Sequence, residues 1–146
     1  MTSLLLMCLI AGRRAAIPTE RVLSVIEIEA VTPIPMTPDF IVGLTALRSQ
    51  ALTVIDCRVS LGFPPSDRVS GSRAAVVDHE GHRYALLVDE AFDVTEALSQ
   101  PVPVPGGFGD GWRDAAIGMI ETEAGPALLV DVEKLIAGPP RAAAAA

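Results

Sequence analysis

The chain has 146 residues and a formal net charge of −7 at pH 7, and half of its residues are hydrophobic. This length suits one domain, or two interlocked subdomains, with a substantial core. The acidic balance argues against nucleic-acid binding, which needs a basic footprint, and an anionic membrane surface would repel the chain.

The first apolar run, residues 4–11, predicts a buried strand that ends in a turn at residues 11–13. The run is too short to span a bilayer. No positive charge precedes it, and Arg13 and Arg14 follow it, which is the reverse of a secretory signal peptide. We therefore expect a cytoplasmic protein.

The two cysteines, Cys8 and Cys57, lie far apart in the sequence and in no C-x-x-C arrangement. One disulfide is conceivable, but single cysteines in apolar strands are typical of buried thiols in a reducing compartment. We expect two buried thiols.

Residues 22–31 form the next predicted strand, because they are rich in β-branched residues and alternate from Ile26 onwards. Glu27 and Glu29 should lie on one face, opposite Ile26 and Ile28. The prolines that follow cannot sit inside a sheet, so the strand ends there.

The region after this strand carries several short signals. Thr37 and Pro38 can cap and start a helical turn. Residues 51–56 predict another strand. Residues 63–72 predict a loop, because they contain prolines, glycine and serines.

Two hairpins are predicted in the second half of the chain. The first joins strands at residues 74–77 and 84–88 through a four-residue tip, residues 79–82. The second repeats this pattern with Gly125 in its turn. Between them, residues 100–114 form a long loop rich in proline and glycine.

A short pattern occurs twice, as "LTVIDCRVSLG" and as "LLVDVEKLIAG". Each copy has an apolar strand, an aspartate, a short helical stretch and a glycine. Asp56 and Asp131 can accept hydrogen bonds from the first free N–H groups of the helix, and Gly62 and Gly138 can supply a left-handed exit. Two such units predict two similar small β-barrels, each finished by a short helix.

No stretch has the pattern of a catalytic centre. His79 and His82 are too few for a metal site and fit a solvated hairpin tip. The run "GGFGDG" lacks the strand and helix that a phosphate-binding loop needs. Asp56 and Asp131 are explained as helix caps, and no G-x-S-x-G stretch is present. We therefore expect no enzyme and no cofactor or metal.

A binding module is the remaining class. Small antiparallel barrels bind partners along exposed strand edges or in apolar surface grooves. Trp112, the one tryptophan, is either an interface anchor or a residue buried within its own domain.

Residues 43–62 make the comparison specific. They read glycine, three residues, Leu-Arg, a short gap, and then apolar-Val-Ile-Asp-x-Arg-x-x-Leu-Gly, which resembles the signature of CheW-type chemotaxis coupling proteins. The blocks "TPDFIVG" (37–43), "YALLVDEAFDV" (84–94) and "LLVDVEKLI" (128–136) resemble other parts of that family in the same order. The resemblance covers about residues 3–137.

The resemblance implies a mostly β fold of two interlocked five-stranded SH3-like β-barrel subdomains with short capping helices. We expect a single CheW-like domain over residues 1–138. Its first subdomain should be centred on about 20–70, and its second on about 72–138 together with the N-terminal strand. Residues 139–146 are a low-complexity tail.

The resemblance also implies a non-enzymatic adaptor that is recruited to membrane receptor arrays. Such an adaptor couples the regulatory domain of a CheA-type histidine kinase to the tips of methyl-accepting chemoreceptors. The alternative is a CheW-like scaffold for another kinase pathway, such as a type IV pilus system, with an altered receptor surface. Neither nucleic acid nor direct membrane insertion is expected.

Arg48 falls on the arginine of the family's Asn-Leu-Arg-Gly motif. The resemblance implies that this arginine lies beside a receptor-binding groove, and the alternative is an ion pair or backbone cap within the domain. The resemblance implies six protein-binding residues: Arg48, Leu47, Ser49, Val22, Val25 and Phe40. For the four apolar ones, Leu47, Val22, Val25 and Phe40, the alternative is a place in the core.

Three residues depart from the family pattern. Ala46 and Ser49 replace the asparagine and the glycine of the motif, and Ser24 replaces a glutamate. Serine disfavours a positive φ, so we expect the turn at Ser49 to differ in shape. The departures concern the partner more than the fold.

Overall fold

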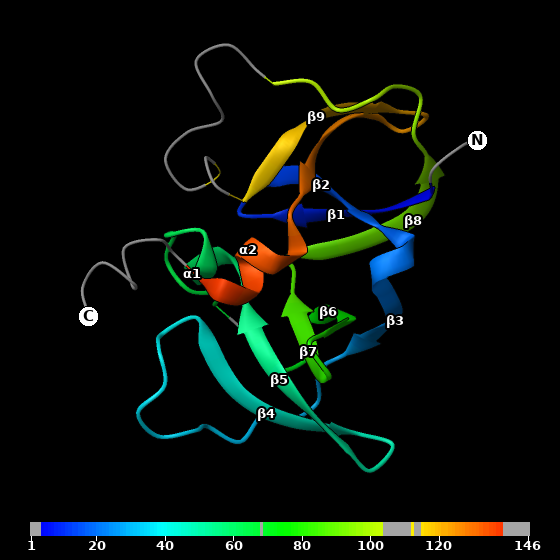
Figure 1. Cartoon of the computed structure of the whole chain (residues 1–146). Helices are drawn as coiled ribbons and strands as arrows, with labels where there is room; N and C mark the ends of the chain where they lie inside the picture. Colours follow the sequence, from blue (N-terminus) through cyan, green and yellow to red (C-terminus); the bar gives the residue numbers. More distant parts are fainter. Residues whose placement is uncertain (1–3, 68, 104–111, 113–114, 139–146) are drawn as a thin grey trace.

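The computed structural model describes residues 4–67, 69–103, 112 and 115–138. Their strands form two five-stranded sheets, stacked one above the other in Figure 1. Sheet A has the strand order β8 (Glu90–Glu96), β1 (Leu4–Ile10), β2 (Arg13–Pro18), β10 (Gly125–Val130) and β9 (Ala116–Thr122). Sheet B has the order β3 (Val22–Glu27), β6 (Arg73–His79), β7 (His82–Leu87), β5 (Gln50–Asp56) and β4 (Ile41–Leu47).

The two sheets have the same internal plan. Each contains one parallel pair, β10 with β2 in sheet A and β5 with β7 in sheet B, among antiparallel neighbours. A short helix follows β5 and β10, namely α1 (Cys57–Ser60) and α2 (Val132–Ala137), and the two helices lie together between the sheets (Figure 1). The twofold unit predicted from the repeated pattern is therefore confirmed.

Neither sheet is closed into a barrel, which corrects the expectation of two barrels. Instead, the chain that leaves one edge strand makes isolated bridges to the other edge. Thr32, beyond β3, bridges to Leu44 of β4, and Ala97, beyond β8, bridges to Thr122 of β9. Val102, further along the same segment as Ala97, makes a second bridge, to Met119 of β9. Isolated bridges hold the two edges of each sheet together without a continuous ladder, so each unit is a nearly closed sheet.

The hydrophobic core has three parts. The largest lies between the sheets and contains residues of both, and it is called the shared core here; Ile17 and Leu128 of sheet A and Leu86 of sheet B are among its members. Two smaller clusters consist mainly of residues of a single sheet, one of sheet B and one of sheet A. Trp112 is 1% exposed within the shared core, which agrees with burial in its own domain rather than a role as an interface anchor.

Cys8 and Cys57 are both buried in the shared core and both free, as predicted. Burial raises the pKa of Cys8 to about 12, and it also raises the pKa of Cys57. Both thiols are therefore protonated and unreactive at neutral pH.

The assignment of strands to subdomains needs one correction. We expected the second unit to begin near residue 72, but β6 and β7 belong to sheet B with β3, β4 and β5. The chain builds β1 and β2 in sheet A, completes all of sheet B, and returns to sheet A with β8. The boundary therefore follows β7, because the β6–β7 hairpin pairs with β3 and β5.

Local details also differ from expectation. The tip of the β6–β7 hairpin is a two-residue turn, because His79 and His82 are themselves paired across the strands. The hydroxyl of Thr37 donates backwards to the Ile34 carbonyl instead of capping, whereas Pro38 begins a single turn, as predicted. The predicted tail, residues 139–146, and most of the glycine-rich loop lie outside the described residues.

The alternation predicted near the end of β3 is confirmed, although the strand ends at Glu27. Glu27 and Glu29 are exposed, whereas Ile28 is 1% exposed and Ile26 packs against the core of sheet B.

Both predicted helix caps are present. The Asp56 carboxylate accepts the Arg58 N–H at 3.0 Å, and the Asp131 carboxylate accepts the N–H of Glu133 at 3.1 Å. Asp56 is 3% exposed and also accepts the backbone N–H and the hydroxyl of Ser66, at 2.9 and 3.1 Å. It therefore holds the loop after α1 as well as the helix.

Because of these additional bonds, Asp56→Ala should destabilise the protein more than Asp131→Ala. A lost cap alone costs about 0.5–2 kcal/mol, and Asp131→Ala should fall in that range. Asp56→Ala also leaves the Ser66 donors without their acceptor, which adds about 1 kcal/mol or more. Urea denaturation of the two variants would test this order, and equal losses would contradict it.

Two glycines allow the near closure of the sheets. A Cβ on Gly43 of β4 would lie 2.3 Å from the Thr32 carbonyl oxygen, and a Cβ on Gly118 of β9 would lie 2.8 Å from that of Val102. Val102 and Thr32 both make bridges to the opposite edge strand. The segments that contain them can come this close to β9 and β4 only because glycine has no side chain there.

We predict that Gly43→Ala destabilises the protein by about 3 kcal/mol or more, because a positive φ and a backbone collision coincide there. Gly12→Ala is the matched control: Gly12 has φ +78° but nothing within 4 Å of its Cβ position, so only the backbone penalty of about 1–2 kcal/mol applies. Chemical denaturation measures both. Similar losses of unfolding free energy in the two variants would show that the Thr32 backbone moves aside without an energetic cost, and would contradict the prediction.

Candidate docking surfaces

The hairpin between β4 and β5 turns through two residues, Arg48 and Ser49, with Leu47 and Gln50 paired beneath them. The φ angles of Arg48 and Ser49 are 52° and 68°. Positive φ at both central residues defines the tight turn that matches the twist of the strands. Ser49 thus keeps a positive φ although its side chain disfavours it.

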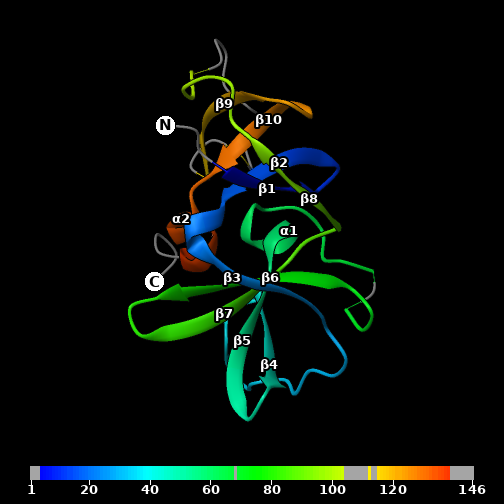
Figure 2. The same ribbon diagram turned by 90° about the vertical axis from the view of Figure 1, so that its right-hand side faces the viewer.

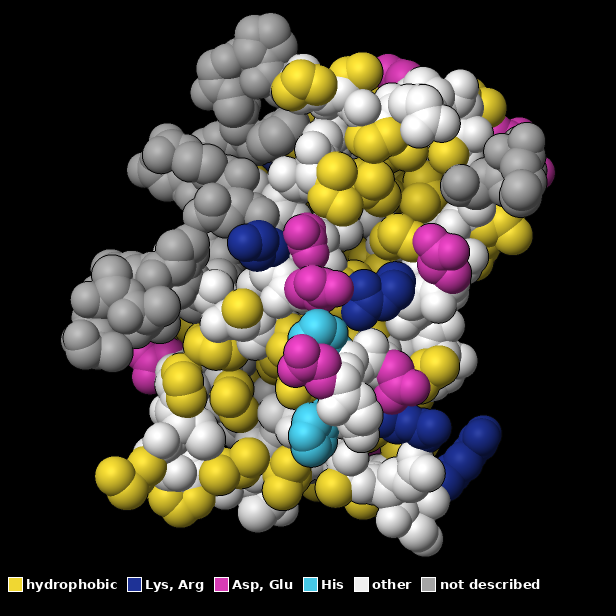
Figure 3. All heavy atoms as spheres, in the orientation of Figure 1, with side chains coloured by type: hydrophobic (Ala, Val, Ile, Leu, Met, Phe, Trp, Pro, Cys, Tyr) yellow, Lys and Arg dark blue, Asp and Glu magenta, His cyan; other side chains and the backbone are white. Residues whose placement is uncertain are grey.

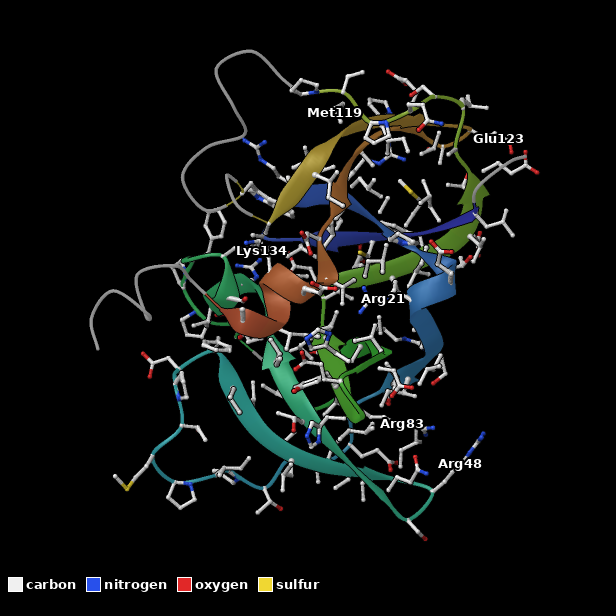
Figure 4. All side chains as sticks on the ribbon, in the orientation of Figure 1. Arg21, Arg48, Arg83, Met119, Glu123 and Lys134 are labelled. Atoms are coloured by element: carbon white, nitrogen blue, oxygen red, sulfur yellow. The ribbon has the colours of Figure 1, made fainter. Side chains whose placement is uncertain are left out.

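Arg48 is exposed at this turn, and its side chain points away from sheet B (Figure 4). Within the described part of the chain it makes no recorded hydrogen bond or ion pair. By contrast, Arg83 on the neighbouring hairpin bonds to the Gln50 side chain and lies 3.6 Å from Asp78. The alternative of a structural contact for Arg48 therefore has no support here.

The other predicted site residues are divided between surface and core. Leu47 is partly buried against the core of sheet B, and Val22 is partly buried against the shared core. Phe40 is 6% exposed, and a Cβ on Gly138 would lie 2.2 Å from its Cε1 atom. Phe40 is therefore a residue of the shared core, which is the alternative that the sequence left open for it.

Val25 is 38% exposed on β3, but it is not beside Arg48. The register places Val25 in line with Ala75, Leu86, Ile55 and then Ile41, at the opposite end of β4 from the hairpin turn. The predicted residues therefore do not form one continuous patch.

Two edge strands expose apolar residues that the sequence did not single out. Leu23 is 50% exposed beside Val25 on β3, and Phe92 and Val94 are 46% and 51% exposed on β8. Both strands carry a bulge at this place. Figures 1 and 2 place β3 and β8 on the same side of the molecule, one from each sheet. Leu23, Val25, Phe92 and Val94 are called the edge-strand surface below.

Hydrophobic side chains also gather over the upper part of the face in Figure 3, above a band of charged and histidine side chains. A pocket of about 490 Å³ lies in the sheet A half. Its apolar lining includes Leu4, Leu5, Pro18, Ala97, Ile120 and Leu129. None of the predicted site residues contributes to it.

No group of three potential metal ligands occurs among the described residues. His79 and His82 flank a turn at the surface, and His79 Nε2 lies 3.8 Å from the Glu80 carboxylate. The helices of the described part are too short and polar to cross a bilayer.

The fold class is thus a pair of nearly closed five-stranded sheets around one shared core. Residues 4–139 match the family model of the CheW-like domain, and the chain belongs to that family. The solved structure of the scaffolding protein TtCheW from Thermoanaerobacter tengcongensis superposes with a TM-score of 0.76 at 23% identity, over 90% of each chain.

Curated relatives agree with this assignment. A probable chemotaxis protein CheW of Rhizobium etli is 33% identical over 88 residues, which are 56% of this chain and 57% of the relative. The chemotaxis protein CheW of Helicobacter pylori is 26% identical over 98 residues (65% and 59%). FrzA of Myxococcus xanthus is 44% identical over 43 residues (30% and 27%). The chain thus spans less than two thirds of the length of these relatives.

The backbone of the turn yields a prediction. Ser49→Gly should stabilise the protein by about 0.5–1 kcal/mol, because relief of the positive φ exceeds the added chain entropy of glycine. Gln50→Gly, one residue further and inside β5, should instead destabilise by a similar amount. Melting curves of the two variants give the comparison. A loss of stability in Ser49→Gly would contradict the inference that the positive φ of Ser49 strains the turn.

Proposed function

We propose that this protein is a non-enzymatic adaptor that couples the regulatory domain of a CheA-type histidine kinase to the cytoplasmic tips of chemoreceptors. Membership of the CheW-like family supports the proposal, as does the similarity of the chain to chemotaxis relatives over 56% and 65% of its length. The observation that carries it is Arg48: an exposed arginine on a two-residue turn, with no hydrogen-bond or ion-pair partner in the described part of its own chain.

The receptor tip is proposed to contact Arg48 and the edge-strand surface. An arginine on a short turn offers a planar fork of donors that suits a carboxylate, while its stem covers apolar surface. Exposed apolar side chains on an edge strand suit the apolar face of a helical partner. Two separate contact areas fit a partner that spans both sheets.

The experiment is calorimetric titration of the protein with two probes from the same organism, the kinase regulatory domain and a soluble receptor-tip fragment. Wild type should bind both with micromolar or tighter affinity. Arg48→Glu should weaken binding of the receptor-tip fragment about tenfold or more, which is about 1.4 kcal/mol, at an unchanged melting midpoint.

Arg13→Glu is the matched control, because Arg13 is also exposed and the substitution makes the same charge change on sheet A. A sharp fall in the melting midpoint of Arg48→Glu would make Arg48 structural. Binding to the kinase domain without binding to the receptor tip would favour a scaffold of another kinase pathway. Failure to bind either probe would remove the proposed function.

A further inference from the structure

Asp89 lies between β7 and β8 and is bonded to parts of both sheets. Its carboxylate accepts two hydrogen bonds from Arg58 of α1, Nε to Oδ1 at 2.8 Å and Nη2 to Oδ2 at 3.0 Å. It also accepts the Gly12 N–H from the β1–β2 turn at 3.1 Å, and its own N–H donates to the Leu9 carbonyl at 2.8 Å. One residue thus joins α1, the helix after β5 of sheet B, to the β1–β2 hairpin of sheet A.

The geometry of this joint is specific to arginine. Two parallel bonds from a planar guanidinium fix the direction of the carboxylate as well as its distance, which a lysine ammonium cannot do. The side chains of Arg58 and Asp89 are 35% and 19% exposed, so the pair is partly shielded from water. Because β8 begins at the next residue, Glu90, the joint also fixes where β8 starts relative to sheet B.

Among the described residues, the corresponding place in the other half has no arginine–carboxylate pair, although Arg21 there donates to the Asp78 carbonyl at 3.3 Å. Arg58 is the second residue after the cap Asp56, and the second residue after the cap Asp131 is Glu133, which cannot form it. β3 is entered through the 3-10 turn Thr19–Arg21, which has no side-chain cap bond. One of the two repeated units therefore forms without this ion pair, so a sheet with its following helix does not need the pair in order to fold.

We propose that Arg58 and Asp89 are positioning residues that hold the edge of β8 at a fixed place relative to β3, so that a partner can contact the edge-strand surface on both strands at once. The inference rests on the proposed function and extends it to the residues that set the spacing between the two contact strands. It assigns them no direct contact with the partner.

The test uses Arg58→Lys and Asp89→Asn, with Arg83→Lys as the matched control because the Arg83–Asp78 pair is exposed and lies outside the joint. Amide hydrogen exchange needs no partner. Exchange at Gly12 and through residues 89–94 should accelerate about tenfold or more in the two joint variants. Residues 44–51 should not change, and the control should resemble wild type throughout.

Binding of the receptor-tip fragment provides the second measurement. Arg58→Lys should weaken it about fivefold to tenfold in the wild-type background. In a Val94→Ser background the same substitution should have little further effect, because the residue acts through β8. A purely structural role for Arg58 would leave the two effects additive.

The outcomes separate this inference from the proposed function. Unchanged exchange in residues 89–94, or unchanged affinity of both joint variants, overturns the positioning role while wild-type binding still supports the adaptor. Absence of wild-type binding removes the proposed function and the docking part of this inference together. Should Arg58→Lys fail to fold, Asp89→Asn gives the same comparison with α1 intact.

Discussion

The shared core between the sheets is the constraint on which the rest of the molecule depends. A five-stranded sheet that is nearly closed can fill its own interior, but the outer face of each sheet here also carries apolar residues. Leu86 and Val77 of sheet B must be covered by Ile17 and Leu128 of sheet A. Because the chain builds part of sheet A first and finishes it last, neither half can complete its packing without the other. The hydroxyl of Ser60 on α1, which donates to the Leu135 carbonyl on α2, ties the helices across the same boundary.

What the sequence predicted best was local chemistry. Asp56 and Asp131 could be recognised as caps because each aspartate and the N–H groups that it accepts, two or three residues further on, are close neighbours in the chain. The placement of β6 and β7 in sheet B could not be predicted in the same way, since it depends on pairing between segments far apart in sequence. The resemblance gave the correct number of strands for each unit, but closure is decided by backbone contacts such as Gly43 against Thr32.

The docking surfaces show a different limit. Phe92 and Val94 alternate with Asp93, a pattern that normally indicates an apolar face turned inward. Both side chains are instead substantially exposed, because β8 is an edge strand, and its pairing with β1 contains a bulge, a feature with no reliable sequence signal. Phe40 is the opposite case, because it was a candidate for the docking surface and is buried. It belongs to a block that resembles the family, yet its ring packs against the exit of α2, where Gly138 leaves room for it.

The residues that match the family and those that depart from it have different physical positions. Gly43 allows a close backbone crossing, Asp56 holds a helix and a loop, and Arg58 joins the two halves, so their replacement would disturb the fold. Ser24, Ala46 and Ser49 are exposed, and apart from the strained φ of Ser49 their replacement alters the surface more than the packing. A chain can therefore keep this architecture while its partner changes. It follows that the fold carries little information about the partner, and under the proposed function that information lies in the exposed turn and the two edge strands.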